Sequence, residues 1–391
     1  MRVVRLVMMA AVACGAVGLV WAQRPERTPA SQERRPGTTE VRPGQFRAPE
    51  FPPPSIIDYR PKPMLVIEEH LVPKARYPVI DIHSHQRATA DNMDRLIGEM
   101  DALNLQVIVN LSGGSGDRLR EGVETVRTSA YTDRFRLFAN VGWRNVGPGF
   151  GQKAAAQLEQ DIKAGAIGLK VAKNLGMTTR TSDGARLHID DPELDPIWDM
   201  AGRMNVPVLI HTAEPPAFFE PLDYANERWL ELALFPDRRN YDPDQVRFET
   251  LVAERDRMFR KHPNTRFIAA HFGYLAHDLK GAGQVLDAIP NMYLDVSAVL
   301  YDFGRQPRAA RAFFIKYQDR LLFGKDAYQP TEFPYYWRVF ETTDEYFDYY
   351  RDYHAFWKLY GMNLPDEVLK KLYYQNALRL VPGLPRAGFP G

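Results

Sequence analysis

The feature that most constrains the fold of this chain is a series of eight short apolar runs, rich in β-branched residues. The runs alternate with longer stretches that have helical periodicity. Near-continuous apolar runs are typical of parallel strands that are covered on both faces. The predicted strands are residues 78–85, 105–111, 135–143, 166–172, 206–211, 265–271, 292–298 and 320–326.

The stretches between these runs carry helix signals. Asp191 followed by Pro192 is an N-cap with proline at the first helical position. Apolar residues then recur at helical spacing, as they also do after the first run. The two apolar faces are Leu194, Ile197, Trp198, Ala201 and Met204, and Met93, Leu96, Ile97, Met100 and Leu103.

Eight strand-helix units over about three hundred residues predict an α/β fold, a (β/α)8 TIM barrel. A doubly wound open sheet is the alternative, but no glycine-rich phosphate-binding turn follows the first run. We expect an extra N-terminal strand at residues 64–67, and long insertions after the fifth and eighth strands (the β5–α5 and β8–α8 connections). The barrel domain is predicted to span residues 64–385.

The first sixty residues differ from the rest. Arg2 and Arg5 precede an apolar run at 6–21, which predicts a signal peptide at 1–22 and an exported protein, periplasmic or secreted. The run is too short for a comfortable transmembrane span. Cys14, the only cysteine, lies within it, so a lipid anchor at Cys14 is the alternative. Residues 23–63 hold ten of the thirty prolines and predict a disordered leader.

The charge balance gives no reason to expect a nucleic acid or an anionic membrane as partner. The formal net charge is +1, with 25% charged and 45% hydrophobic residues, which is an ordinary globular composition. A small-molecule substrate is the expected partner. The sequence leaves open whether the protein forms a homo-oligomer.

Ionisable side chains gather at the ends of the predicted strands. His83 and His85 are two residues apart on the first strand, so both imidazoles point to the same side. The carboxyl ends of all barrel strands meet at one mouth, where active sites are built. Imidazoles and a carboxylate suit a zinc-like ion, which lowers the pKa of a bound water towards ~7. The other strand-end residues are Arg144, Lys170, His211, His271 and Asp326.

Several motifs resemble the amidohydrolase superfamily, in the branch that includes aminocarboxymuconate-semialdehyde decarboxylase and related lactonases and hydrolases. They are DIHSH (81–85), IHT (210–212), AHFG (270–273), FGKD (323–326) and YQNALRL (374–380). The resemblance covers residues 78–381. It implies one divalent metal ion, zinc above all, held by His83, His85, His211 and Asp326. It also implies that His271 is either a catalytic histidine or one that supports the ligands beside the metal. Asp326 can accept the proton of the metal-bound water, so we expect it to be catalytic as well.

Two details stay open. Lys170 ends the fourth strand, where some members of the superfamily have a carboxylated lysine that bridges two metals. We favour one metal and an unmodified Lys170 that faces substrate or packs in the barrel mouth. Lys325 stands where the family has a small hydroxylated residue, and strand alternation should turn its ammonium away from the metal. Arg87 and Arg144 are candidate clamps for a substrate carboxylate, ahead of Arg180. The remaining histidines are interpreted as structural: His70, His188, His262, His277 and His354.

The two insertions are predicted to cover the mouth. About fifty residues follow His211 before the next strand, and loops of that length are usually functional. Aromatic residues are abundant after Asp326 and predict either an aromatic-walled pocket or an oligomer interface. The first insertion contributes an apolar face made of Phe218, Phe219, Trp229 and Leu230.

Three functions fit these residues. The first is a metal-dependent hydrolase that uses activated water to cleave an amide, ester or lactone bond. The alternative is a non-oxidative decarboxylase of an aromatic or unsaturated carboxylic acid, which the same metal site would serve. The third is a non-catalytic module of the cell envelope that uses the barrel for binding. We place the hydrolase first.

Overall fold

The computed structural model describes residues 37–354 and 357–390. Contacts divide the chain into two units, Met1–Tyr59 and Arg60–Gly391. The described part of the first unit holds an antiparallel hairpin of β1 (Thr39–Arg42) and β2 (Gln45–Arg47), almost all of it exposed. The sequence did not predict this hairpin. The predicted signal peptide and residues 23–36 of the predicted leader lie outside the described residues.

The second unit is the predicted barrel. All eight apolar runs form strands, which are shorter than the runs themselves, and every paired neighbour is parallel. Phe138 interrupts the third barrel strand, which consists of β5 and β6. The strands are β3 (Val79–Ser84), β4 (Leu105–Asn110), β5 (Phe135–Leu137), β6 (Ala139–Asn140), β7 (Leu169–Val171), β8 (Val208–Ile210), β9 (Phe267–Ala269), β10 (Met292–Asp295) and β11 (Leu321–Leu322).

The barrel closes between β11 and β3. The backbone N–H of Ile82 donates to the carbonyl of Phe323 at 3.2 Å, and Ser84 forms a parallel bridge with Asp326. At the break in the third strand, the backbone N–H of Phe138 donates to the carbonyl of Asn110. The next N–H, of Ala139, donates to the carbonyl of Gly168 on the other side. The two hydrogen-bonded groups of strands therefore join into one ring of eight.

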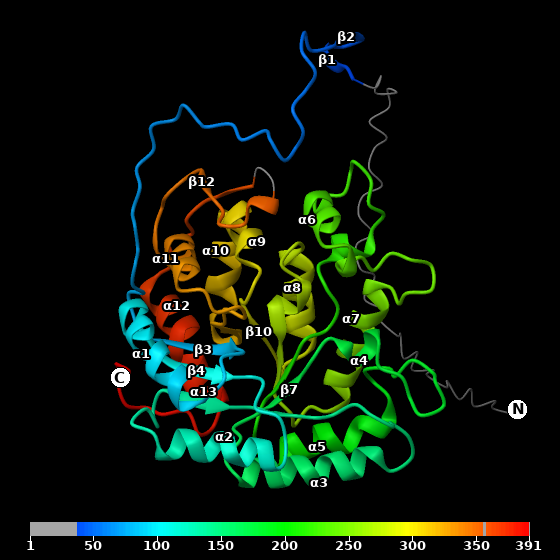
Figure 1. Ribbon diagram of the computed structural model, residues 1–391, viewed down its shortest axis with the longest axis vertical. Coiled ribbons are helices and arrows are strands. Elements are labelled where there is room, and N and C mark those ends of the chain that lie inside the picture. The colour runs from blue at the N-terminus through cyan, green and yellow to red at the C-terminus, as the bar shows by residue number, and fades with distance from the viewer. Residues whose placement is uncertain (1–36, 355–356, 391) are drawn as a thin grey trace, which may run out of the picture. The chain divides into compact units, whose positions relative to one another are not determined.

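Helices follow the strands and surround the barrel (Figure 1). Their inward faces are the predicted ones: in α1 the residues Met93, Leu96 and Met100 are fully buried, and in α5 Ile197 and Trp198 are. The covering helices are α1 (Ala90–Leu103), α2 (Asp117–Thr128), α3 (Phe150–Lys163), α5 (Asp195–Arg203), α7 (Phe248–Lys261), α8 (Leu279–Ala288), α10 (Pro307–Lys316) and a final helix of α12 (Asp366–Lys370), a π-helical turn (Lys371–Gln375) and α13 (Asn376–Leu380).

The expected extra strand at residues 64–67 is wrong. This segment has no strand or helix, and Met64 and Val66 are 95% and 102% exposed. A β-branched apolar run has the propensity for a strand, but a strand also needs a hydrogen-bonded neighbour. The closed barrel offers no free edge on which to add one.

The insertions after the fifth and eighth barrel strands are present and meet at one buried cation. The first contains α6 (Trp229–Leu234), and the second contains α11 (Phe333–Glu341) with a short β12–β13 pair (Phe347–Asp348 and Lys358–Leu359). Arg228 of the first insertion is 4% exposed and donates to Glu231 at 2.6 Å and to His354 of the second at 3.1 Å. Its guanidinium also lies 4.7 Å from the ring centre of Tyr301, in the helix α9 (Leu300–Arg305).

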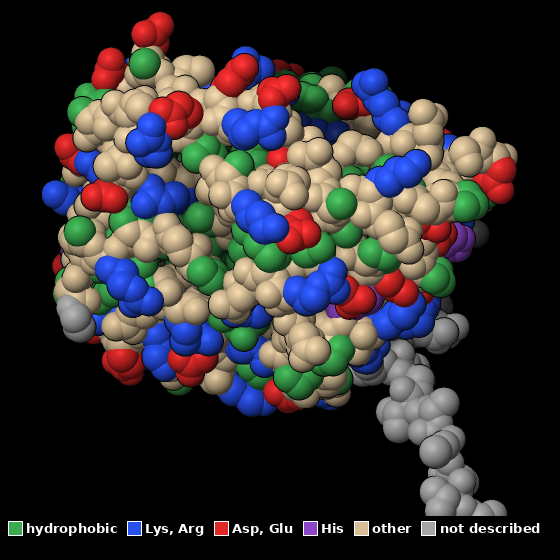
Figure 2. Space-filling model, turned by 90° about the horizontal axis from the view of Figure 1, so that it is seen from below, with side chains coloured by type: hydrophobic (Ala, Val, Ile, Leu, Met, Phe, Trp, Pro, Cys, Tyr) green, Lys and Arg blue, Asp and Glu red, His purple; other side chains and the backbone are tan. Residues whose placement is uncertain are grey.

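The surface agrees with the balanced charge of the sequence. On the face shown in Figure 2, positive and negative side chains are interspersed and hydrophobic side chains are scattered. Within the described part of the chain, no helix is both long enough and apolar enough to cross a membrane.

We predict that Glu231→Gln destabilises the protein by about 3 kcal/mol at pH 7, because it leaves the buried Arg228 without its carboxylate. Burial alone would raise the pKa of Glu231, but its neighbours His354 and the charged Arg228 lower it to about 2. A lowered carboxylate pKa stabilises the fold above the unfolded pKa, and this stabilisation is lost as the pH falls from about 4.5 to 2. Urea unfolding of both proteins measures the difference.

The difference between Glu231→Gln and wild type should therefore shrink as the pH falls through this window, and a pH-independent difference would contradict the assignment. Glu124→Gln is the matched control. Glu124 pairs with Arg127 on the surface of α2, with both side chains more than half exposed, so its removal should change stability little.

Candidate metal centre

His83 offers one ring nitrogen to the barrel mouth. Its Nδ1–H donates to Asp295 Oδ2 at 2.9 Å, so Nε2 carries the free lone pair. Burial, and next the ammonium of Lys170, lower the pKa of His83 to about 4, so the ring is neutral at pH 7. A neutral imidazole whose other nitrogen is bound to a carboxylate is the usual state of a metal-ligating histidine.

His85 and Asp326 face the same point. His85 Nδ1 is 2.7 Å from Ser112 Oγ, which leaves Nε2 directed at Asp326. Burial lowers the pKa of His85, and Lys170 adds to this. Burial alone would raise the pKa of Asp326, but the neighbouring imidazoles, His83 foremost, lower it below its usual value. Asp326 is therefore a carboxylate at neutral pH.

These three side chains fit a divalent metal ion. Asp326 Oδ1 is 3.6 Å from His83 Nε2 and 3.5 Å from His85 Nε2, and the three ligand atoms lie within 4.8 Å of one another. Two ligands bound at about 2.1 Å with a tetrahedral angle lie about 3.4 Å apart. The donor set is two neutral nitrogens and one anionic oxygen, which zinc and similar ions accept.

The fourth predicted ligand, His211, contacts His271. His211 Nδ1 is 3.2 Å from His271 Nε2, and His211 Nε2 is 3.2 Å from the hydroxyl of Tyr274. The ring of His271 in turn lies 4.9 Å from that of His83, centre to centre. The structure thus brings His83, His85 and Asp326 together and connects His211 to them through His271.

Lys170 points into the same space. It is the central residue of β7, is 6% exposed, and its Nζ is 3.2 Å from His83 Nε2. Burial lowers the pKa of Lys170 to about 8. Lys170 is the fourth-strand lysine at which a two-metal site would require carboxylation, and its contact with His83 places the amino group beside the candidate ligands.

The role of the predicted arginine clamps stays a prediction. Arg87 and Arg144 are both exposed. Lys325 turns away as strand alternation predicts: its Nζ donates to Glu332 at 2.5 Å and to the carbonyl of Ala327 at 2.9 Å. Lys170 is a buried cation in direct contact with a candidate ligand.

Sequence reasoning missed the carboxylate that organises the two sides of the site. Asp295 ends β10 and is fully buried. Its Oδ2 accepts from His83, and its Oδ1 accepts from the backbone N–H of His271 at 2.9 Å and from the hydroxyl of Ser297 at 2.5 Å. Burial alone would raise its pKa, but the charge and hydrogen bond of His83 lower it. The signal was an aspartate in an otherwise uncharged run, 292–298.

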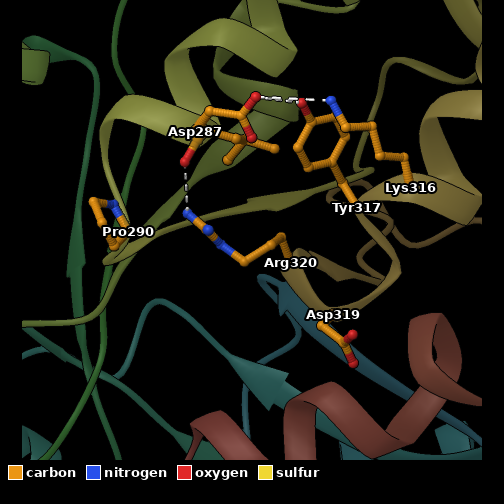
Figure 3. A pocket seen from close by; sticks show the side chains of 7 residues that line it. Asp287, Pro290, Lys316, Tyr317, Asp319 and Arg320 are labelled. Atoms are coloured by element: carbon orange, nitrogen blue, oxygen red, sulfur yellow. Dashed lines mark hydrogen bonds and ion pairs between the residues drawn. The ribbon is translucent and has the colours of Figure 1, made fainter.

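Other charged groups lie apart from the mouth. His188, Asp190 and Glu254 also form a cluster of ligand type, but Arg186 already pairs with Glu254. A cavity of about 360 Å³ lies at the opposite, N-terminal end of the strands (Figure 3). There Asp287 accepts from the Tyr317 hydroxyl at 3.1 Å. This cavity is lined by Leu286, Asp287, Pro290, Lys316, Tyr317, Asp319 and Arg320.

A family model described as "Amidohydrolase" matches residues 129–383 of this chain. The matched range contains His211, His271 and Asp326, whereas His83 and His85 precede it. No curated protein matches the chain.

Several solved structures are similar to this one. One is an uncharacterised TIM-barrel protein from Bordetella bronchiseptica, with 16% identity over 78% of this chain and 98% of the other and a TM-score of 0.49. A dihydroxybenzoic acid decarboxylase from Polaromonas sp., with bound manganese and an inhibitor, has 16% identity, coverages of 78% and 96%, and a TM-score of 0.48. A 5-carboxyvanillate decarboxylase from Novosphingobium aromaticivorans, with manganese, has 14% identity over 78% of this chain and 96% of the other, and a TM-score of 0.47. At these identities the similarity is one of structure alone.

We predict that Asp295→Asn weakens metal binding 10–100-fold, because the amide no longer fixes His83 with its Nε2 lone pair towards the metal. Titration of metal-free protein with zinc or cobalt measures the affinity. The His83→Ala/His85→Ala double variant should bind no metal and defines the baseline. Asp287→Asn, which changes an aspartate in the cavity at the other end of the barrel, should bind metal like wild type. Wild-type affinity in Asp295→Asn would contradict the prediction.

Proposed function

This chain belongs to the amidohydrolase family, and on that premise we propose that it is a metal-dependent enzyme acting on a small carboxylic acid. Within this proposal, non-oxidative decarboxylation is the first candidate reaction and hydrolysis is the second. The sequence alone placed them in the opposite order. The position of Lys170 is the observation that reverses it.

Lys170 has no carboxylate partner of its own. Among the described residues, no carboxylate oxygen lies within 4.0 Å of its Nζ, although the side chain is almost fully buried. A buried ammonium is costly unless an anion compensates it. With a pKa of about 8 the amine is mostly protonated at pH 7. A substrate carboxylate is the anion that this position favours, and it would lie next to His83, at the reacting centre.

Decarboxylation needs few groups, and the chain supplies them. Lys170 binds and orients the substrate carboxylate. When the carbon–carbon bond breaks, carbon dioxide leaves and the electron pair remains on the former α or ring carbon. A proton must then be delivered to that carbon. His271 is the imidazole nearest to His83 among those that we do not propose as ligands, and we assign it this role.

One divalent ion is part of the proposal, and zinc is the first candidate because the ligand set contains histidines. The ion would be held by His83, His85 and Asp326, with His211 as the fourth residue that the family resemblance implies. It would supply Lewis acidity towards substrate oxygen atoms. The two insertions would exclude water from the mouth, which strengthens the interaction of Lys170 with a carboxylate.

The second candidate, hydrolysis of an amide, ester or lactone bond, is favoured by Asp326. Its pKa is lowered and its side chain is 33% exposed, so a carboxylate is available to accept a proton from an attacking water. His271 would then stabilise the developing oxyanion. A purely binding role in the cell envelope, the third candidate, is supported by none of these features.

We predict carbon dioxide release in a screen of phenolic acids, unsaturated carboxylic acids and lactones with the metal-loaded protein. The screen is run in ¹⁸O-water and analysed by mass spectrometry. Decarboxylation yields a product without the carboxyl group and without the heavy oxygen. Hydrolysis would instead place one ¹⁸O atom in the product and release no carbon dioxide, and this outcome would restore the original order.

Lys170→Met separates the binding role from metal binding. The substitution keeps the volume of the side chain and removes the charge, so KM for the carboxylic acid should rise and metal content should stay at one ion per chain. Arg87→Met, which removes an exposed cation near the mouth, is the matched control and should leave KM close to wild type.

We predict that His271→Asn keeps the metal but lowers kcat 10²–10⁴-fold, as expected for a group that transfers a proton. Metal content by elemental analysis and the pH–rate profile are the measurements, and the acid-side limb of the profile should change. A metal-free variant would make His271 a ligand. A fully active variant would make it structural. Either result overturns the assignment.

A further inference from the structure

A left-handed turn follows the sixth barrel strand. The φ and ψ angles are 56° and 41° at His271, 58° and 22° at Phe272, and 59° and 20° at Gly273. Tyr274 also has a positive φ, of 52°. Three of these four consecutive residues are not glycine, and left-handed conformations are costly for residues with a Cβ. Consecutive strained residues persist only where the surroundings fix them, and they are concentrated at functional sites.

The surroundings fix this turn from three directions. The buried guanidinium of Arg255 donates to the carbonyl of Gly273 at 2.9 Å. Asp295 accepts the backbone N–H of His271 at 2.9 Å. Phe272 is fully buried and packs against Phe303, with ring centres 4.9 Å apart. Two hydrogen bonds and the packing of Phe272 therefore hold the turn in its left-handed conformation.

The turn presents two side chains to the same partner. His271 and Tyr274 are one left-handed turn apart, with ring centres 5.3 Å apart, and both contact His211. The Tyr274 hydroxyl is also 3.0 Å from Glu214 Oε2, and Lys173 forms an ion pair with the other carboxylate oxygen of Glu214. Neither Tyr274 nor Glu214 was singled out from the sequence.

The donors and acceptors of this chain define the tautomer of His211. A carboxylate only accepts, so the Tyr274 O–H donates to Glu214. The hydroxyl oxygen then has a lone pair for His211, which must donate from Nε2–H. In a neutral imidazole this leaves Nδ1 without a proton. Nδ1 is the nitrogen on the side of His271, and the ring of His271 adjoins that of His83. Because His271 donates its Nδ1–H to the carbonyl of Ser297 at 3.0 Å, its Nε2 donates to His211 Nδ1 only when His271 is protonated on both nitrogens.

We propose that Tyr274, backed by Glu214, is a positioning residue that fixes the ring of His211 with its proton on Nε2 and with its unprotonated Nδ1 towards His271 and the barrel mouth. The part that concerns metal binding rests on the proposed function. If His211 completes the ligand set, it does so through Nδ1. The carboxylate–phenol pair then orients it as Asp295 orients His83, with a hydroxyl inserted between carboxylate and imidazole.

The first test is cobalt affinity of the metal-free protein, measured by titration with the visible spectrum as a second readout. Tyr274→Phe should weaken binding 10–100-fold and change the spectrum, with little change in the melting temperature of the metal-free protein. Tyr373→Phe is the matched control: it removes a buried Tyr–Glu hydrogen bond of 2.8 Å, to Glu341, and should leave cobalt binding unchanged. Equal effects of the two variants, or wild-type affinity in Tyr274→Phe, would overturn the proposal.

Glu214 is tested through the same measurement. Glu214→Gln retains an oxygen that accepts from Tyr274 and should lose less affinity than Glu214→Ala. If the two residues act in series, the Glu214→Ala/Tyr274→Phe double variant binds cobalt no more weakly than Tyr274→Phe alone. Additive losses would show that Glu214 does not act through Tyr274 and would overturn that part.

A metal-independent test distinguishes this proposal from the proposed function. In metal-free protein labelled with ¹⁵N-histidine, the signals of His211 are assigned with a His211→Asn variant. Wild type should show the Nε2–H tautomer, and Tyr274→Phe should show a mixture. If wild type binds no cobalt, the proposed function fails, and these spectra still decide the positioning role. An Nδ1–H tautomer in wild type would overturn it.

Discussion

The candidate site depends on the closure of the barrel between its first and eighth strands. One oxygen of Asp81 accepts the backbone N–H groups of both His83 and Lys325, each at 3.0 Å. The carbonyl of His83 in turn accepts the N–H of Asp326 at 2.6 Å. Without these contacts the histidines and the aspartate would have no fixed distance. Burial raises the pKa of Asp81 to about 7, because the charged form of this carboxyl group is destabilised in the core.

The closure also explains two backbone features at the eighth strand. A Cβ on Gly324 would lie 2.7 Å from the Cβ of His83, so the two strands approach too closely for any other residue. Asp326 has φ of +75°, a conformation that non-glycine residues rarely adopt. The side chain that the site needs is thus presented by a strained residue two positions after this close contact between the first and eighth strands.

Electrostatics then distinguish two sides of the mouth. Asp295 connects them, since one oxygen orients His83 and the other holds the turn that carries His271. Lys170 lies with His83 and lacks a carboxylate partner, whereas Tyr274 and Glu214 lie with His211. In this arrangement the side with His83 and Lys170 can bind a metal ion and an anionic group. The side with His211 and Tyr274 carries hydrogen-bond donors at fixed positions.

Much of the fold could be predicted from local patterns. The eight runs became strands, the faces of α1 and α5 were the expected ones, and Lys325 turned away from the mouth because side chains alternate along a strand. Residues 64–67 show where such reasoning fails. Their apolar, β-branched composition is correct for a strand, but composition does not reveal whether a neighbouring strand has a free edge.

The sequence by itself determined which ionisable residues stand at the ends of the strands, because strand period and chain order fix that. It therefore indicated His83, His85, Lys170, His211, His271 and Asp326 as one group. Only the tertiary structure decided how the group divides. The left-handed turn at His271, the carboxylate of Asp295 and the insertion that brings Glu214 to Tyr274 depend on contacts between residues 24 to 212 positions apart. No local pattern encodes such contacts, since they arise when the closed barrel brings distant strand ends together.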